Sequence, residues 1–196
     1  ELKQTIKDPL FYVYLTLSCT PPILMTGFLF YQTHIATYYQ WPFELLALGL
    51  LCYAIAKVIG TLIIGPIVDS KGPIGPFSIL ILCMGIGAAL VGIGGPPWVL
   101  ICLFCFFGFG LGLSASVTTV LWATLYGTTH LAEIKGFISI ARNGGTALAP
   151  LPIAFILETM GVSIHLIFLY SGLFVVGLSM IPMIVCRFDK RLQKPN

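Results

Sequence analysis

The chain of 196 residues contains too little charge to fold as a soluble domain. Hydrophobic residues make up 58% of it, only 9% of its residues are charged, and its mean hydropathy is +1.00. Soluble domains contain about 25% charged residues, so this composition is typical of a protein that spans the lipid bilayer. The net charge of +3 comes from basic residues that stand singly at the edges of apolar runs. Without a basic patch to follow phosphates, nucleic-acid binding is excluded.

Turn residues and charges divide the sequence into six apolar spans, because about 20 apolar residues are enough to cross a hydrocarbon layer of about 30 Å. The predicted spans cover residues 10–32, 45–68, 77–94, 98–126, 137–160 and 164–186. Residues 10–186 therefore form one transmembrane domain, preceded by a linker (1–9) and followed by a polar tail (187–196). Glu1 in place of an initiator Met indicates a fragment, and no signal peptide is expected.

Lys and Arg are distributed very unevenly between the two ends of these spans. Eight of the ten basic residues fall on the side shared by the linker, residues 69–76, residues 127–136 and the tail: Lys3, Lys7, Lys71, Lys135, Arg187, Lys190, Arg191 and Lys194. Basic loops stay in the cytoplasm. We therefore expect an integral protein of the plasma (cytoplasmic) membrane with both termini cytoplasmic.

The cysteines do not predict a redox or metal site. All six lie inside or at the end of apolar runs, where cysteine behaves as a small hydrophobic residue. Cys102 and Cys105 form a C-x-x-C, but the surrounding residues are bulky and apolar, whereas reactive thiols need a polar, partly exposed setting. We expect no cofactor and no metal.

A motif of the form G-x-x-x-D-x-x-G, made by Gly65, Asp69 and Gly72, lies at the cytoplasmic end of the second span. There a small residue allows helices to approach, and a carboxylate can cap the next helix or pair with a basic residue. The motif resembles the loop motif of the major facilitator superfamily of transporters, in which it would control switching between states. The family pattern has further basic residues where this chain has Ser70 and Pro73. That erosion is typical of the carboxy-terminal half.

Two other stretches resemble the same superfamily. Residues 21–32 are similar to the seventh helix, and residues 126–150 to the tenth-to-eleventh loop and eleventh helix, of the branch near the monocarboxylate and oxalate/formate carriers. The resemblance implies an all-α bundle built as a three-plus-three inverted repeat, half of a twelve-helix secondary transporter. It also implies an amino-terminal six-helix half as partner and a small solute, such as a carboxylate, moved by alternating access. The solute's identity, and antiport versus proton symport, stay open.

Lys57 is the most informative single residue. It lies 12 residues before Asp69, about 18 Å along a helix and therefore near the bilayer centre, where a lysine costs about 2.5 to 3.5 kcal/mol. Tyr53 and Thr61 lie four residues to either side on the same face. This polar stripe predicts an anion-binding or gating lysine, and the alternative is an ion pair with the other half.

Arg142 is the second cation inside a span. It lies 7 residues after Lys135, so it is a candidate either for solute contact, with Asn143 nearby, or for reaching back to the headgroups. In the inverted repeat its helix is equivalent to that of Lys57, and the related carriers place cationic residues on both helices.

The same inverted repeat predicts which of the other spans face lipid and which line the transport pathway. Spans three and six carry no charge and are expected to face lipid. Spans one and four are expected to line the pathway, with the candidates Thr26, Tyr31, Gln32, Ser114, Thr118 and Trp122. The glycines of spans three and four indicate close helix packing or hinges. Pro21 and Pro22 indicate a kinked or a broken first span.

Two other classes of function fit parts of the sequence. Gly112-Leu113-Ser114-Ala115 and His165 resemble parts of a rhomboid-like serine protease, but Ala115 replaces the Gly of G-x-S-G and the H-x-x-x-N is missing. An enzyme is therefore not expected. A channel-like or structural membrane subunit is the other alternative, because half a transporter cannot alternate access alone.

Overall fold

The computed structural model describes residues 5 and 7–188, and within them the chain is helical apart from short turns, with no strand. Six segments are long and apolar enough to cross a membrane. They are α2 (Pro9–Tyr38), α3 (Glu44–Lys71), α4 (Ile74–Ile93), α5 (Trp98–Tyr126), α6 (Leu131–Leu148) with α7 (Pro150–Met160), and α8 (Ile164–Leu178) with α9 (Ile181–Phe188). The predicted all-α bundle of six spans is confirmed.

The helices extend beyond the apolar runs that predicted them. α2 continues past residue 32 to Tyr38, and α6 already begins at Leu131. The prediction of a loop over residues 127–136 is therefore wrong, since Glu133 and Lys135 lie on α6. Hydropathy marks the part of a span that lies in hydrocarbon, whereas backbone hydrogen bonds carry the helix on into the headgroup region.

The fifth span is interrupted at Ala149. Pro150 and Pro152 have no N–H, so the carbonyl groups four residues earlier lose their usual helical donors, and Ala149 N instead donates to the Thr146 carbonyl at 3.3 Å. In the first span Pro21 and Pro22 lie inside an uninterrupted α2. The broken-helix alternative for that span is wrong, and the break lies in α6–α7 instead.

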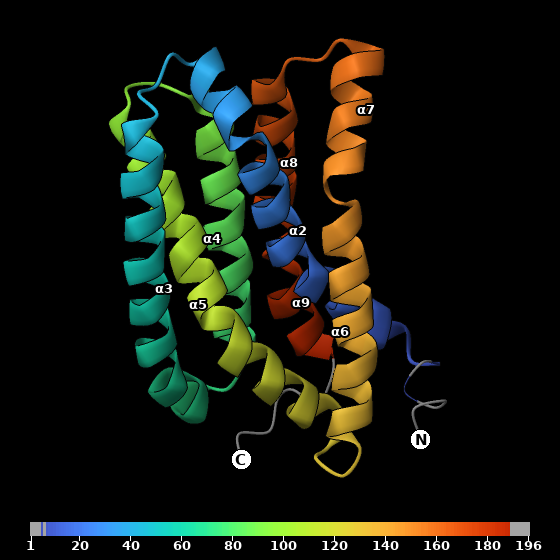
Figure 1. Ribbon diagram of the computed structural model, residues 1–196. Helices are drawn as coiled ribbons and strands as arrows, with labels where there is room; N and C mark the ends of the chain where they lie inside the picture. The colour runs from blue at the N-terminus through green and yellow to red at the C-terminus, as the bar shows by residue number, and fades with distance from the viewer. Residues whose placement is uncertain (1–4, 6, 189–196) are drawn as a thin grey trace.

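Figure 1 shows α2 and α5 crossing the front of the bundle between α3 at one edge and α6–α7 at the other, with α4 and α8–α9 behind. The most extensive contacts pair α3 with α5, α4 with α8 and α4 with α5, whereas α2 packs less extensively on α6. Exchanging spans one to three for spans four to six turns the α3–α5 pair into the α2–α6 pair and leaves the α4–α8 pair unchanged. The α4–α5 contact has no equally extensive counterpart between α2 and α8, so the packing follows the relation of a three-plus-three repeat only in part.

Glycines allow the closest of these contacts. A Cβ added at Gly108 would overlap the Tyr53 carbonyl of α3, and one added at Gly112 would overlap the Lys57 carbonyl. The glycines that make the same kind of backbone approach between α4 and α8 are Gly85, Gly92 and Gly172. The close-packing interpretation is confirmed for Gly85, Gly92, Gly108 and Gly112, and Gly172 of the sixth span was not predicted.

The most buried span is α4. Buried residues make up 67% of its apolar window, against 17% for α3 and 6% for α6–α7. The expectation that the uncharged third span faces lipid is therefore wrong. An apolar helix rich in small residues suits the inside of a bundle as well as it suits lipid, so charge alone does not separate the two environments.

Candidate functional site

The basic residues at helix ends gather at one end of the bundle. This basic end, at which α2 begins and α9 ends, carries Lys7, Lys71, Lys135 and Arg187. The turns at the opposite end, residues 39–43, 94–97 and 161–163, contain neither Lys nor Arg. Lys3, Lys190, Arg191 and Lys194 lie outside the described residues. Only Lys57 and Arg142 remain as cations in the middle of spans.

The acidic residues offer these two cations no partner at their depth. Those among residues 7–188 all lie at or near helix ends: Asp8, Glu44, Asp69, Glu133 and Glu158. A positive charge in hydrocarbon is tolerated when a counter-charge or water compensates it. Within this part of the chain no carboxylate does so for Lys57 or Arg142.

Lys57 is exposed, although it lies on the stripe of α3 that also contains the buried Ile64. Its Nζ lies 5.9 Å from the centroid of the Tyr53 ring, a cation–π distance. The Thr61 hydroxyl lies within donating distance of the carbonyl oxygens of both Lys57, at 2.9 Å, and Gly112, at 3.1 Å. The structure therefore brings Tyr53, Lys57 and Thr61 together, with the Thr61 proton already engaged by the backbone.

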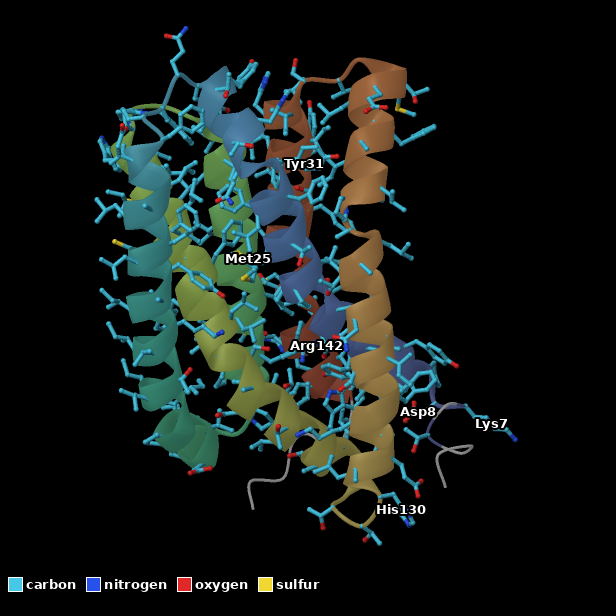
Figure 2. The ribbon with its side chains drawn as sticks, in the orientation of Figure 1. Lys7, Asp8, Met25, Tyr31, His130 and Arg142 are labelled. Atoms are coloured by element: carbon cyan, nitrogen blue, oxygen red, sulfur yellow. The ribbon has the colours of Figure 1, made fainter. Side chains whose placement is uncertain are left out.

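Arg142 is half-buried on the face of α6 that packs on α2, a face that also carries the buried Ile138 (Figure 2). Its guanidinium makes no hydrogen bond or ion pair with the side chains in the described part of the chain. Asn143 is exposed on the neighbouring stripe, and the Thr146 hydroxyl donates to the Arg142 carbonyl at 2.7 Å. Because α3 and α6 form opposite edges of the bundle (Figure 1), Lys57 and Arg142 lie on separate edges and do not meet.

The pathway candidates on α2 and α5 separate into two groups. Tyr31, labelled in Figure 2, donates its hydroxyl to the Pro150 carbonyl at 3.2 Å, so it joins α2 to the break between α6 and α7. Thr118 is half-buried and donates to the Ser114 carbonyl of its own helix. Ser114 and Trp122 are buried in the bundle, Trp122 with 1% of its surface exposed, so they are core residues and not pathway residues. Thr26 and Gln32 are half-buried on α2.

The three residues of the loop motif differ in their local roles. Gly72 ends α3 with a φ of +75°, a conformation that favours glycine, and its N–H donates to the Val68 carbonyl at 2.9 Å. Asp69 is exposed in the last turn of α3 and does not cap α4, whose first residues have no side-chain cap. The capping interpretation of Asp69 is therefore wrong. A Cβ at Gly65 would meet no atom within 4 Å, so this chain offers no packing reason for that glycine.

Tyr39 connects two helices at the opposite end of the bundle. Its hydroxyl lies within donating distance of the carbonyl oxygens of Val91, at 2.9 Å, and Gly92, at 3.1 Å, and its ring stacks on Trp41. Burial, with a smaller contribution from Tyr38, raises the pKa of Tyr39 to about 12. The hydroxyl therefore stays protonated and able to donate at physiological pH.

The geometry excludes a serine protease dyad. Ser114 lies 16 residues after the start of α5, about 24 Å from the opposite end of the bundle. His165 is the second residue of α8, at that opposite end, where its ring stacks on Tyr38 with 5.3 Å between centroids. No proton can pass directly between groups so far apart.

A cavity of about 350 Å³ lies between α2, α6–α7 and α8, and none of the predicted site residues lines it. Its walls include Gly145, Ala149 and Ile153 around the break in the fifth span. The sequence contains one signal for this irregular region, the Pro-x-Pro of residues 150–152, because prolines in the middle of a span indicate irregular backbone.

The family model described as Major Facilitator Superfamily matches residues 8–196, which is nearly the whole chain. No curated protein matched the chain. With the six-span bundle, this match identifies the chain as a member of the major facilitator superfamily, a family of transporters of small solutes and not of enzymes.

Proposed function

We propose that this chain is the carboxy-terminal six-helix half of a secondary transporter and that it carries a small organic anion, such as a carboxylate, by alternating access. The eroded loop motif at Gly65 to Gly72 supports the assignment to the carboxy-terminal half. The little-buried spans α3 and α6–α7, which form the two edges of the front face (Figure 1), support the assignment to one half of a transporter, because they leave surface for another six-helix half to cover. The solute then binds between the halves, and rocking of one half against the other exposes it to each side in turn.

The observation that supports an anionic solute is the pair of mid-span cations, Lys57 and Arg142. Neither has a carboxylate at its depth among residues 7–188. Each is an expensive charge in hydrocarbon unless a counter-charge is supplied. A solute carboxylate supplies it, and the two residues together give this half of the pathway a positive charge. Any acid that couples transport to protons is then contributed by the other half.

The proposed orientation places the basic end of the bundle in the cytoplasm of a plasma membrane. Lys7, Lys71, Lys135 and Arg187 all lie at this end, and basic segments resist translocation across the membrane. In this orientation the loop motif lies at the cytoplasmic surface and the Tyr39 contact at the outer one.

A transport assay tests the proposal. Cells that produce the full-length transporter are given labelled mono- and dicarboxylates, neutral sugars and organic cations, and the saturable uptake is measured against cells without it. We expect saturable uptake of one or more carboxylates only. Arg142→Gln should reduce this uptake at least about tenfold at equal protein abundance, as expected when the solute carboxylate loses its charged partner. Lys71→Gln, a charge removed from the exposed end of α3, is the control and should transport normally. Uptake of neutral or cationic solutes alone would contradict the proposal.

A further inference from the structure

The cavity between α2, α6–α7 and α8 is almost entirely apolar. Three helical segments form its walls, and Figure 1 shows them as neighbours at the α7 edge of the bundle. Ser171 is the only polar side chain in the lining, and its hydroxyl already donates to the Phe168 carbonyl at 3.0 Å. A volume of about 350 Å³ lies within the range of small-molecule sites and has room for about a dozen water-sized groups. Its walls suit hydrocarbon and offer no partner to water or to a polar solute.

Arg142 lies one helical turn away from this cavity and is not one of its lining residues. It precedes Gly145, a wall residue, by three positions on the same face of α6, so its backbone lies roughly 5 Å nearer the basic end. Ile23 of α2, another wall residue, packs against Gly145. An apolar cavity of limited size thus lies one turn from a cation that has no hydrogen bond or ion pair with the described side chains.

We propose that this cavity is the apolar half of the solute site: it receives the hydrocarbon body of an amphipathic carboxylate whose charged group lies at Arg142. The inference rests on the proposed anion transport and narrows its solute to carboxylates with an apolar body of up to about ten carbons, in preference to small hydrophilic acids. Charge complementarity at Arg142 supports the position of the head, and the apolar walls support the position of the tail.

The bundle contains a second cavity that serves as an internal comparison. It also has a volume of about 350 Å³ and apolar walls, but α3, α4 and α5 form it, on the far side of the bundle from Arg142. Cys105 in this second cavity and Ser171 in the first are both small and half-buried. Enlarging each of them to Phe fills the two cavities to a similar extent and separates a role in solute binding from a general effect of packing.

The test measures competition, so that passive permeation of longer acids does not disturb it. Uptake of the labelled carboxylate identified in the transport assay is inhibited by straight-chain carboxylates from acetate to tetradecanoate at neutral pH. Each methylene that enters an apolar site should lower the inhibition constant about threefold to fourfold. The decrease should end near ten carbons, when the cavity is full.

Three variants decide the location of the tail. Ser171→Phe should raise the inhibition constant of octanoate at least about tenfold and leave that of acetate unchanged, while Cys105→Phe should change neither. Ile156→Ala, which enlarges the first cavity, should move the end of the series to longer chains and provides a gain that a misfolded variant cannot mimic.

The outcomes separate the two proposals. If carboxylates are transported but chain length does not affect inhibition, the cavity proposal is wrong and the proposed function stands. If Ser171→Phe affects acetate and octanoate equally, the cavity holds a membrane lipid or serves packing, which also overturns the inference. If no carboxylate is transported, the proposed function itself fails.

Discussion

The backbone of Lys57 is held in a contact between two helices, while its charged side chain stays exposed. Gly112 lets α5 approach the Lys57 carbonyl, and Thr61 bridges the same carbonyl to α5. The position of the lysine along the bundle is therefore set by the contact of two helices. Its ammonium group reaches the bundle surface beside Tyr53, where a partner from outside this half can approach it.

We predict that Lys57→Gln abolishes saturable carboxylate uptake at near-normal protein abundance, because glutamine keeps length and polarity but loses the charge. Lys57→Arg should also transport poorly, since the wider guanidinium fork does not replace a compact ammonium group. Uptake and surface abundance are measured together, with Lys71→Gln as the control. Restoration of uptake in Lys57→Gln by neutralising an acid elsewhere in the transporter would identify a structural ion pair and disprove an anion site.

Asp69 is an exposed carboxylate in the last turn of α3 that caps no helix. If it pairs with a basic residue in only one state of the cycle, it shifts the balance between states by the free energy of that contact. We predict that Asp69→Asn lowers the maximal transport rate at least about fivefold and changes the solute KM less than twofold, a shift of about 1 kcal/mol. Initial rates over a range of solute concentrations separate the two quantities. Ser70→Ala is the neighbouring control, and equal rates in Asp69→Asn and wild type would leave Asp69 as a residue of the turn.

At the scale of elements, the contact between α3 and α5 depends on the absence of a side chain. A Cβ at Gly112 would overlap a backbone carbonyl, which cannot rotate away, so the two helices would have to separate. Overpacking of this kind typically costs about 1 to 3 kcal/mol.

We therefore predict that Gly112→Ala lowers the thermal stability of the purified transporter and reduces carboxylate affinity, because Lys57 moves with α3. Gly177→Ala is the matched control on α8, where an added Cβ meets no atom within 4 Å, and alanine there should be neutral or stabilising by up to about 1 kcal/mol. Thermal unfolding in detergent measures both. A Gly112→Ala protein as stable as the Gly177→Ala protein would show that the helices accommodate the extra carbon.

The whole molecule is polarised by charge, and this makes its orientation testable. With all six native cysteines replaced, a single cysteine at Lys71 should resist a membrane-impermeant thiol reagent in intact cells, and one at Gln40 should react. Both positions are exposed, at the basic and the opposite end respectively. Permeabilised cells should label both and serve as the control. Labelling at position 71 in intact cells would reverse the orientation.

The sequence by itself determined the number of spans, the all-α class and the gathering of basic residues at one end. These follow from transfer free energies that depend on composition and on order along the chain. The sequence also determined that, among residues 7–188, Lys57 and Arg142 are the only Lys or Arg residues in the middle of a span. It predicted in addition that glycines allow neighbouring helices to pack closely.

Only the tertiary structure decided which apolar faces meet other helices and which meet the outside. Lipid and a neighbouring helix are equally apolar, so the sequence did not reveal that α4 is the most buried span or that Trp122 belongs to the core. The cavity one turn from Arg142 depends on how three separate spans pack, and no local pattern encodes the distances between those spans. In a membrane protein the bilayer fixes the spans through composition, and contacts between helices then fix the site.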